Sequence, residues 1–125
     1  MAKFSIYQIQ LSTAQYAAIN GNNTVPAFEA RNAMMMDFKG HKIGGIASDA
    51  FEAGYYTHVC NIEAKDYNEV FHIGNMGPEE NIERLSRMSS LSVGDVIVAE
   101  DGTVAVVAPI GFVAFSHNPK MSAMA

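Results

Sequence analysis

One histidine and the only cysteine of the chain stand two positions apart in a run that is typical of a β-strand. His58 and Cys60 alternate with other residues there, so both side chains are expected on the same face. A thiol beside an imidazole is the pairing of a nucleophile with its base, and both groups are also zinc ligands. His72, further along the chain, is the nearest additional candidate. The chemistry to weigh here is therefore nucleophilic catalysis or metal binding.

The rest of the sequence completes neither site. It has no second cysteine, no Cys-x-x-Cys and no pair of histidines at helical spacing. Gly44-Gly45 and Gly74-x-x-Gly77 lack the Gly-Lys-Ser or Gly-Lys-Thr of a phosphate-binding loop. We therefore expect Cys60 to be a buried free thiol beside a half-buried histidine. We predict that the chain is not an enzyme and that it holds no cofactor and no metal.

Three consecutive methionines form the first candidate binding feature. Met34, Met35 and Met36 cannot all face one core, so at least one is expected to point toward a second surface. Flexible thioethers suit adaptable protein contacts, and core filling is the alternative. We take Met34 and Met35 as candidate binding residues.

A second candidate feature combines aromatic and basic side chains. Tyr55, Tyr56 and His58 come from one expected strand, and Arg84 is a nearby cation. Tyrosine rings stack on nucleotide bases, so these four residues are candidates for a small-molecule pocket.

Composition limits the class of protein. The 125 residues are 49% hydrophobic, which suits one domain with a packed core. Eight Lys plus Arg against thirteen Asp plus Glu give a net charge of −5, which argues against direct nucleic-acid binding. No apolar run is long enough to cross a membrane, and no signal peptide is expected. A single cysteine suits the reducing cytoplasm.

Local signals position the expected helices. Ser12 with Gln15 forms a capping box, Pro26 suits a first helical turn, and Asp66 with Glu69 is another capping pair. Helices are predicted over residues 12–20, 26–37 and 78–88, with shorter helical turns over 48–54 and 67–73.

A hairpin is the clearest strand signal. Val96–Ala99 and Val104–Val107 flank Asp101-Gly102, and a two-residue turn there places Val98 opposite Ala105. Both faces of this hairpin are apolar. The hairpin is therefore either central and covered twice, or one face meets a partner, which leads to the hypothesis of a homodimer.

These elements together predict an α+β fold. We expect a mostly antiparallel sheet of four to five strands, packed by two or three helices, in one domain of residues 1–115 with a flexible tail over 116–125. The predicted strands are residues 4–11, 55–63, 96–100 and 103–115.

Residues of about 69–115 resemble the YodL-like domain. The resemblance is carried by Glu69-Val70-Phe71, Gly74-Asn75, Ser90-Leu91-Ser92-Val93-Gly94-Asp95-Val96-Ile97-Val98, Asp101-Gly102 and Gly111-Phe112. The whole chain is also similar to small uncharacterised proteins of tailed bacteriophages. Within the motif, Asp95 follows Gly94 at a tight turn, where its carboxylate is expected to accept backbone amide bonds.

The resemblance implies a phage-encoded accessory protein in the cytoplasm of the host. The leading prediction is a non-enzymatic protein that binds a host protein, such as a defence or transcription factor, and inhibits or redirects it. One alternative is a protein that sequesters a nucleotide signal or other small molecule, and another is a structural or assembly protein of the phage. An enzyme that uses Cys60 or His58 is the remaining hypothesis.

Overall fold

The fold is α+β, as predicted, with six strands in the sheet where four to five were expected. The structure is a computed structural model that describes residues 2–115, so the predicted flexible tail over 116–125 lies outside the described residues. All strand pairs are antiparallel, in the order β3-β2-β1-β4-β5-β6. The strands are β1 (Ala2–Ile9), β2 (Tyr56–Ala64), β3 (Ile82–Arg84), β4 (Val96–Val98), β5 (Val104–Val107) and β6 (Phe112–Ala114). The helices are α1 (Thr13–Asn20), α2 (Pro26–Met35), α3 (Ile43–Glu52) and α4 (Tyr67–Met76), with a short 3-10 turn η1 (Glu79–Asn81).

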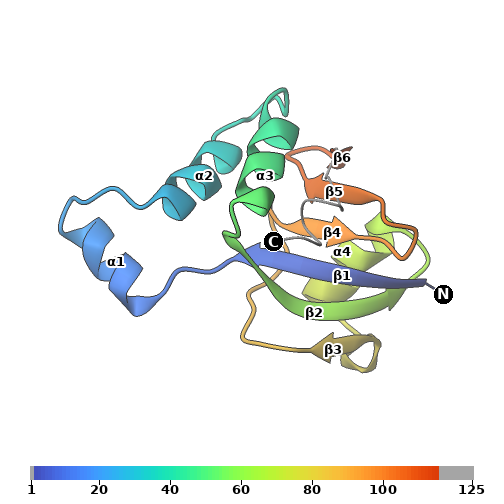
Figure 1. Cartoon of the computed structure of the whole chain (residues 1–125). Coiled ribbons are helices and arrows are strands. Elements are labelled where there is room, and N and C mark those ends of the chain that lie inside the picture. The colour runs from blue at the N-terminus through green and yellow to red at the C-terminus, as the bar shows by residue number, and fades with distance from the viewer. Residues whose placement is uncertain (1, 116–125) are drawn as a thin grey trace.

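Helices cover both faces of the sheet. Helix α4 lies against one face, and α2 and α3 lie against the other, while α1 projects to the side (Figure 1). Two clusters of buried side chains result, one on each face. Successive residues of β1 alternate between them: Ile6 belongs to the α4 side and Ile9 to the α2–α3 side.

Three helix starts that were predicted from local chemistry, those of α1, α2 and α4, are confirmed. Ser12 and Gln15 make a reciprocal capping box at α1, and Pro26 occupies the first turn of α2. The Asp66 side chain accepts a hydrogen bond of 2.8 Å from the Glu69 backbone at α4. Helix α4 was expected to end at Gly74, but it continues to Met76.

Helix α3 is longer than predicted. The sequence predicted only a helical turn over residues 48–54, yet the helix has ten residues and includes Gly44 and Gly45. The side chain of Asp37 accepts hydrogen bonds of 2.8 Å from the backbone of Lys42 and of Ile43, which fixes the helix start. The apolar stripe Ile43, Ala47 and Ala50 is then buried against the sheet, and this burial outweighs the low helix propensity of glycine.

The predicted helix over residues 78–88 is wrong. Only the single turn η1 forms, and the chain continues as edge strand β3, with Ile82 paired to Ile62 of β2. Asn81 Nδ2 also donates a hydrogen bond of 3.1 Å to the Glu63 carbonyl. The outer edge of β2 offers unpaired backbone groups, and pairing with them overrides the local helix signals. Leu85, which follows β3, is exposed.

The hairpin β4–β5 forms, but its register differs from the prediction by one residue. Val98 pairs with Val104, because Ala99 pairs with Thr103 around a three-residue loop rather than a two-residue turn. Gly102 takes a positive φ of 91°, as this loop type requires. The predicted strand over 103–115 is in fact two strands, β5 and β6.

The apolar character of both hairpin faces is explained within one chain. All four residues of β5 are buried, and Val106 and Val107 contribute to different clusters, one on each face of the sheet. The expectation of a central hairpin covered twice is therefore confirmed. A homodimer stays a prediction, but the apolar faces of the hairpin no longer support it.

A β-bulge in β2 shows that the prediction of His58 and Cys60 on the same face of the strand is wrong. Ile6 of β1 pairs with Cys60, but the next residue, Tyr7, pairs with His58, so Val59 is an extra residue in β2. The alternation of side chains is interrupted there. Cys60 points into the cluster under α4, whereas His58 stacks on Tyr7 at the other face.

Candidate functional site

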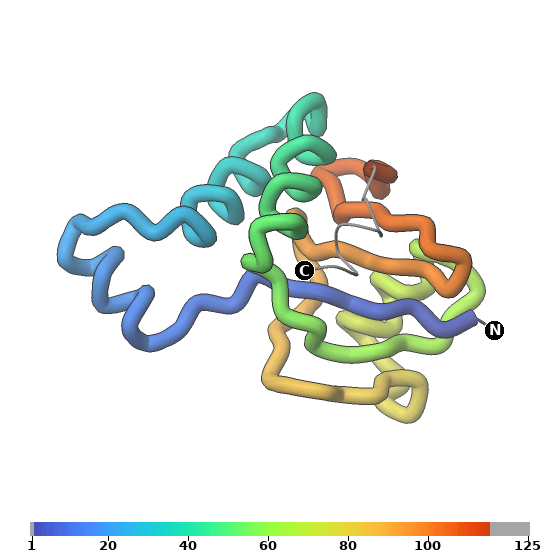
Figure 2. The backbone as a smooth tube through the Cα atoms, viewed as in Figure 1, coloured from blue at the N-terminus to red at the C-terminus, as the bar shows by residue number. Residues whose placement is uncertain are grey.

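A cleft of about 420 Å³ opens where β1 ends. Its walls come from four parts of the chain: the residues at and after the end of β1, helix α1, helix α2 and the segment of residues 85–95. That segment leaves β3 at one sheet edge and passes the end of β1 to reach β4 (Figure 2). The lining residues are Gln8, Ile9, Gln10, Leu11, Tyr16, Arg31, Met35, Arg87, Ser89, Ser92, Val93 and Asp95.

Two glutamines tie the segment of residues 85–95 to β1. Gln8 Nε2 donates to the Ser89 carbonyl at 2.9 Å, and the Ser89 backbone N–H donates back to Gln8 Oε1 at 3.1 Å. Gln10 Nε2 donates to the Arg87 carbonyl. Because residues 8 and 10 lie two positions apart in an extended chain, both side chains point to the same side and bond the segment of residues 85–95. Arg87 and Ser89 are thereby placed at the cleft.

Asp95 is the buried ionisable residue of the cleft, with only 8% of its surface exposed. Its Oδ2 atom accepts hydrogen bonds of 3.0 Å from Gln8 Nε2 and from the Ser92 backbone N–H. The predicted backbone bond at this turn is therefore confirmed. The other oxygen, Oδ1, has no hydrogen-bond partner within residues 2–115.

Burial also changes the acidity of Asp95. Removal from water raises the pKa of this carboxyl from its ordinary 3.8 to about 7, although the bonds from Ser92 and Gln8 and the charge of Arg31 act in the opposite direction. Near neutral pH the cleft therefore contains a carboxyl group that is close to its own titration point.

Two guanidinium groups line the same cleft. Arg31 comes from α2, where its guanidinium carbon lies 5.8 Å from the centre of the Phe28 ring, and Arg87 comes from the segment of residues 85–95. Neither arginine forms an ion pair with a carboxylate in the described part of the chain. Two cations that form no ion pair within the described residues make the cleft suited to an anionic group.

The three consecutive methionines occupy different environments. Met34 is completely buried in the core under α2 and α3, Met35 lines the cleft with 45% of its surface exposed, and Met36 is 60% exposed. At least one was expected to face a second surface, and two do. Of the six candidate residues chosen from the sequence, Met35 is the one that lines this cleft.

Tyr55 and Tyr56 are half-buried and pack on the cluster under α2 and α3. The Tyr56 hydroxyl donates a hydrogen bond of 2.6 Å to the Gly94 carbonyl and lies 3.5 Å from the sulfur of Met34. Burial raises the pKa of this hydroxyl, and the charge of Asp95 raises it further. Tyr56 therefore supports the turn that carries Asp95.

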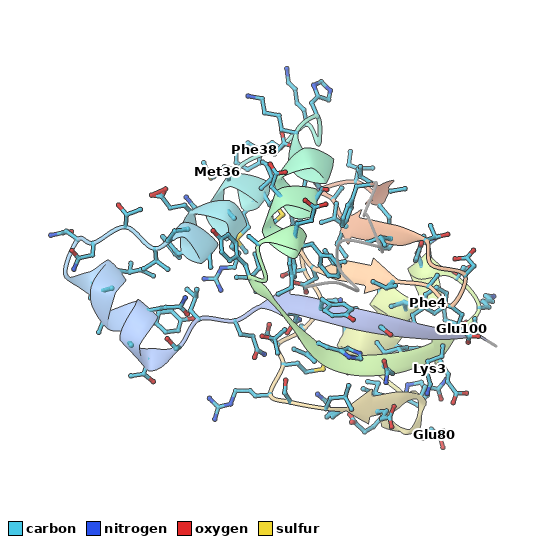
Figure 3. The ribbon with its side chains drawn as sticks, in the orientation of Figure 1. Lys3, Phe4, Met36, Phe38, Glu80 and Glu100 are labelled. Atoms are coloured by element: carbon cyan, nitrogen blue, oxygen red, sulfur yellow. The ribbon has the colours of Figure 1, made fainter. Side chains whose placement is uncertain are left out.

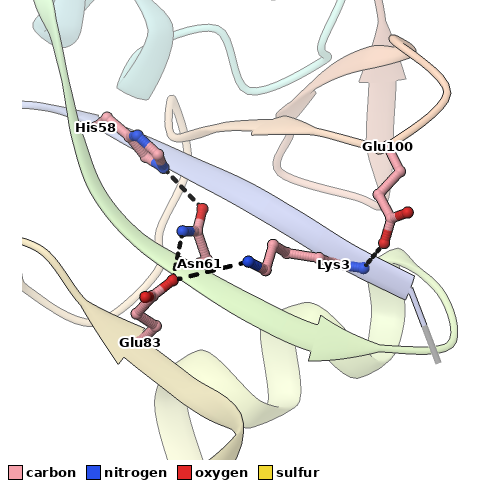
Figure 4. A network of polar contacts seen from close by, with 5 residues as sticks. All are labelled: Lys3, His58, Asn61, Glu83 and Glu100. Carbon is pink, nitrogen blue, oxygen red and sulfur yellow. Dashed lines mark hydrogen bonds and ion pairs between the residues drawn. The ribbon is translucent and has the colours of Figure 1, made fainter.

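His58 belongs to a polar network on the outer part of the sheet (Figure 4). Its ring stacks on Tyr7 with the ring centres 4.8 Å apart, and Nε2 lies 2.8 Å from Asn61 Oδ1. Asn61 Nδ2 donates to Glu83, which also pairs with the Lys3 ammonium at 3.9 Å. The histidine thus has polar and aromatic partners and does not face the cysteine.

Arg84 lies on edge strand β3, where its Nε atom is 2.6 Å from the Glu79 carboxylate. Glu79 therefore engages the cation that was expected to serve a pocket with the tyrosines. Tyr55, Tyr56, His58 and Arg84 are not among the residues that line the cleft.

The thiol of Cys60 is fully buried, and burial raises its pKa to about 11. A protonated, enclosed thiol is a poor nucleophile. Within residues 2–115 no group of three His, Cys, Asp or Glu side chains gathers to hold a metal ion.

Sequence reasoning missed most residues of the cleft. One signal was present: Gln8 follows Phe4 and Ile6 on the inward-facing side of β1, where a third apolar residue is expected. A buried amide at such a position indicates a polar partner from elsewhere in the chain. Arg31 and Arg87 carry no comparable signal, because their proximity depends on the path of residues 85–95.

Comparison with known proteins found no matching family model, no similar curated protein and no similar solved structure. The resemblance of residues 69–115 to the YodL-like domain stays a prediction. None of the helices in the described part of the chain is both long and apolar enough to cross a membrane.

Proposed function

We propose that this chain is a non-enzymatic binding protein and that the cleft at the end of β1 holds a small anionic ligand. The observation that carries this proposal is the pair of guanidinium groups, Arg31 and Arg87, that line the cleft without forming an ion pair in residues 2–115. Guanidinium groups bind phosphate and carboxylate oxygens through paired hydrogen bonds.

The arrangement of the reactive residues supports binding rather than catalysis. Cys60 is enclosed on the α4 side of the sheet and His58 contacts Asn61 on the other side, so the two do not form a nucleophile and base. The phage resemblance supports a role in the host cytoplasm, with a host molecule as the ligand.

Titration calorimetry with pyrophosphate, a simple anionic probe, tests the proposal. We expect the wild-type protein to bind pyrophosphate and the variants Arg31→Gln and Arg87→Gln each to bind it about tenfold more weakly, which is the loss of one charge-assisted contact. Lys42→Gln, which removes an exposed cation outside the cleft, is the matched control and should bind normally. Absence of wild-type binding, or an equal loss in the control, would contradict the proposal.

A host protein is a second candidate partner, and a separate surface favours it. Met36 and Phe38, at the turn between α2 and α3, are 60% and 71% exposed. Figure 3 places both side chains at this outer corner, away from the sheet. Large apolar side chains exposed together are a feature of protein-binding surfaces.

Capture experiments with point variants test this second candidate. The double substitution Met36→Ser and Phe38→Ser should abolish capture of a host protein from lysate. Ile110→Ser removes a side chain that is 91% exposed at the turn between β5 and β6, and it should leave capture intact. A host protein that is captured equally by all three forms would exclude the corner of α2 and α3 as the contact.

A further inference from the structure

The cleft combines three kinds of surface that one ligand must match. Arg31 and Arg87 supply positive charge, and Tyr16 and Met35, which are 49% and 45% exposed, supply apolar area. Asp95, only 8% exposed, supplies a hydrogen-bonding atom from a buried part of the lining. A bare anion satisfies only the first of these surfaces.

The free oxygen of Asp95 has a defined polarity when the carboxyl is ionised. The Ser89 backbone N–H can only donate, so the Gln8 atom that faces it is Oε1, and Gln8 therefore presents its Nε2 to Asp95. Gln8 and the Ser92 N–H both donate to Oδ2, which is then fully occupied. At a pH above about 7, where Asp95 is ionised, the carboxylate therefore offers Oδ1 as an acceptor, and a buried acceptor without a donor is unfavourable by about 1–3 kcal/mol.

We infer that the cleft binds a nucleoside phosphate whose base carries an amino group, as adenine and cytosine do. The amino N–H donates to Asp95 Oδ1, the base packs against Tyr16 and Met35, and the phosphate contacts Arg31 and Arg87. This inference rests on the proposed function, since it names the class of anion that the cleft accepts.

The available space and the number of free acceptor sites support this ligand class. A volume of about 420 Å³ lies within the range of about 300–1,000 Å³ that small-molecule sites span. Guanine presents two parallel donors that match both oxygens of a carboxylate, but Oδ2 of Asp95 is already occupied. One free oxygen matches the single amino group of adenine or cytosine.

Calorimetry at pH 8, where Asp95 is mostly ionised, with adenosine 5′-monophosphate, ribose 5-phosphate and purine riboside 5′-phosphate tests the inference. The third compound is adenosine monophosphate without its amino group. We expect the wild-type protein to bind adenosine monophosphate about tenfold more tightly than purine riboside phosphate, which lacks the bond to Oδ1. Ribose 5-phosphate should bind most weakly, because it also lacks the base.

The variant Asp95→Asn tests the same contact from the protein side. Gln8 and Ser92 both donate, so they should orient the new amide with its oxygen at the Oδ2 position and its NH₂ at the Oδ1 position. An acceptor is thereby replaced by a donor, and we expect the preference for adenosine monophosphate over purine riboside phosphate to disappear. Asp101→Asn, at the exposed hairpin loop, is the matched control.

The outcomes separate the inference from the proposed function. If the three phosphates bind the wild-type protein equally, the nucleoside inference is wrong while the anion cleft stands. If none binds and pyrophosphate does not bind either, both are wrong. If purine riboside phosphate binds as tightly as adenosine monophosphate, the contact with Asp95 is wrong whatever the fold of the Asp95→Asn variant.

Discussion

Two polar networks connect β1 to other parts of the chain, and they differ in their exposure to water. Gln8 and Asp95 form the buried network at the end of β1, where both residues are less than one-tenth exposed. Asn61 and Glu83 belong to the other network, across β2 and β3, which also includes an ion pair between Lys3 and Glu83 with side chains 55% and 60% exposed. Both networks use amides and carboxylates, so residue type does not distinguish them.

The contrast shows that burial decides which carboxyl group has a raised pKa. Burial raises the pKa of Asp95 to about 7. At Glu79, an exposed carboxylate outside both networks, the hydrogen bond and charge of Arg84 lower the pKa of the carboxyl instead. Water screens and satisfies the exposed groups, whereas the buried group retains an oxygen without a protein partner in residues 2–115.

The largest expected effect is a pH dependence of stability that depends on Asp95. A folded-state pKa raised from 3.8 to about 7 means that the folded protein holds a proton which the unfolded chain has lost. The contribution of Asp95 to stability is therefore fully present below pH about 4 and is lost as the pH rises to about 7, by at most about 4 kcal/mol.

Urea unfolding of the wild type and of Asp95→Asn from pH 4 to pH 8 measures this effect. The difference in unfolding free energy between the two proteins should change across that range, with the variant gaining relative to the wild type as the pH rises. Parallel curves would contradict a buried, titrating Asp95.

Removal of the buried amide should have the next largest effect. Gln8→Ala leaves the backbone N–H and carbonyl of Ser89 without side-chain partners and removes one hydrogen bond to Asp95. We expect a loss of about 2–3 kcal/mol in the free energy of unfolding. Asn61→Ala, the equivalent change in the exposed network, should cost about 0.5 kcal/mol or less. Chemical denaturation of both variants makes the comparison, and equal losses would contradict it.

Packing beneath the segment of residues 85–95 provides a third test. A Cβ atom at Gly74 would lie 2.5 Å from Leu91 Cδ1, and the Leu91 backbone N–H donates to Asn75 Oδ1 at 2.6 Å. We expect Gly74→Ala to destabilise the fold by about 1–2 kcal/mol through this overlap. Gly45→Ala is the control, because no atom lies within 4 Å of its added Cβ and alanine favours helix α3; its thermal midpoint should rise.

The smallest effect belongs to the exposed ion pair. Lys3→Ala should change the unfolding free energy by about 0.5 kcal/mol or less, and added salt should reduce even that difference. A loss comparable to that of Gln8→Ala would remove the distinction between the two networks.

The sequence predicted those features that depend on neighbouring residues. The capping box at Ser12 and the cap at Asp66 involve residues three positions apart, and both form as expected. The α+β class followed from the same local signals. The turn at Asp101-Gly102 was located correctly, but its loop length was not, and one residue of loop shifts the whole register.

Features that depend on distant residues were not predictable in this way. The pairing of Ile82 with Ile62 requires an open edge of β2, which no local pattern near residue 82 reveals. The extra residue Val59 reverses the side on which Cys60 lies, and this separated the pair that looked most reactive. In the cleft Gln8 donates a hydrogen bond to Asp95, which lies 87 positions further along the chain. The polar residue at position 8 was the one sign of this contact in the sequence.

The most direct test of the cleft is a nuclear magnetic resonance titration of the ¹⁵N-labelled wild-type protein with adenosine 5′-monophosphate. The account predicts that backbone amide shifts concentrate at the lining of the cleft, at Gln10, Arg31, Arg87 and Ser92, with residues of α4 unchanged. Shifts that are absent at saturating ligand, or that gather on α4 or β6 instead, would contradict a ligand site at the end of β1.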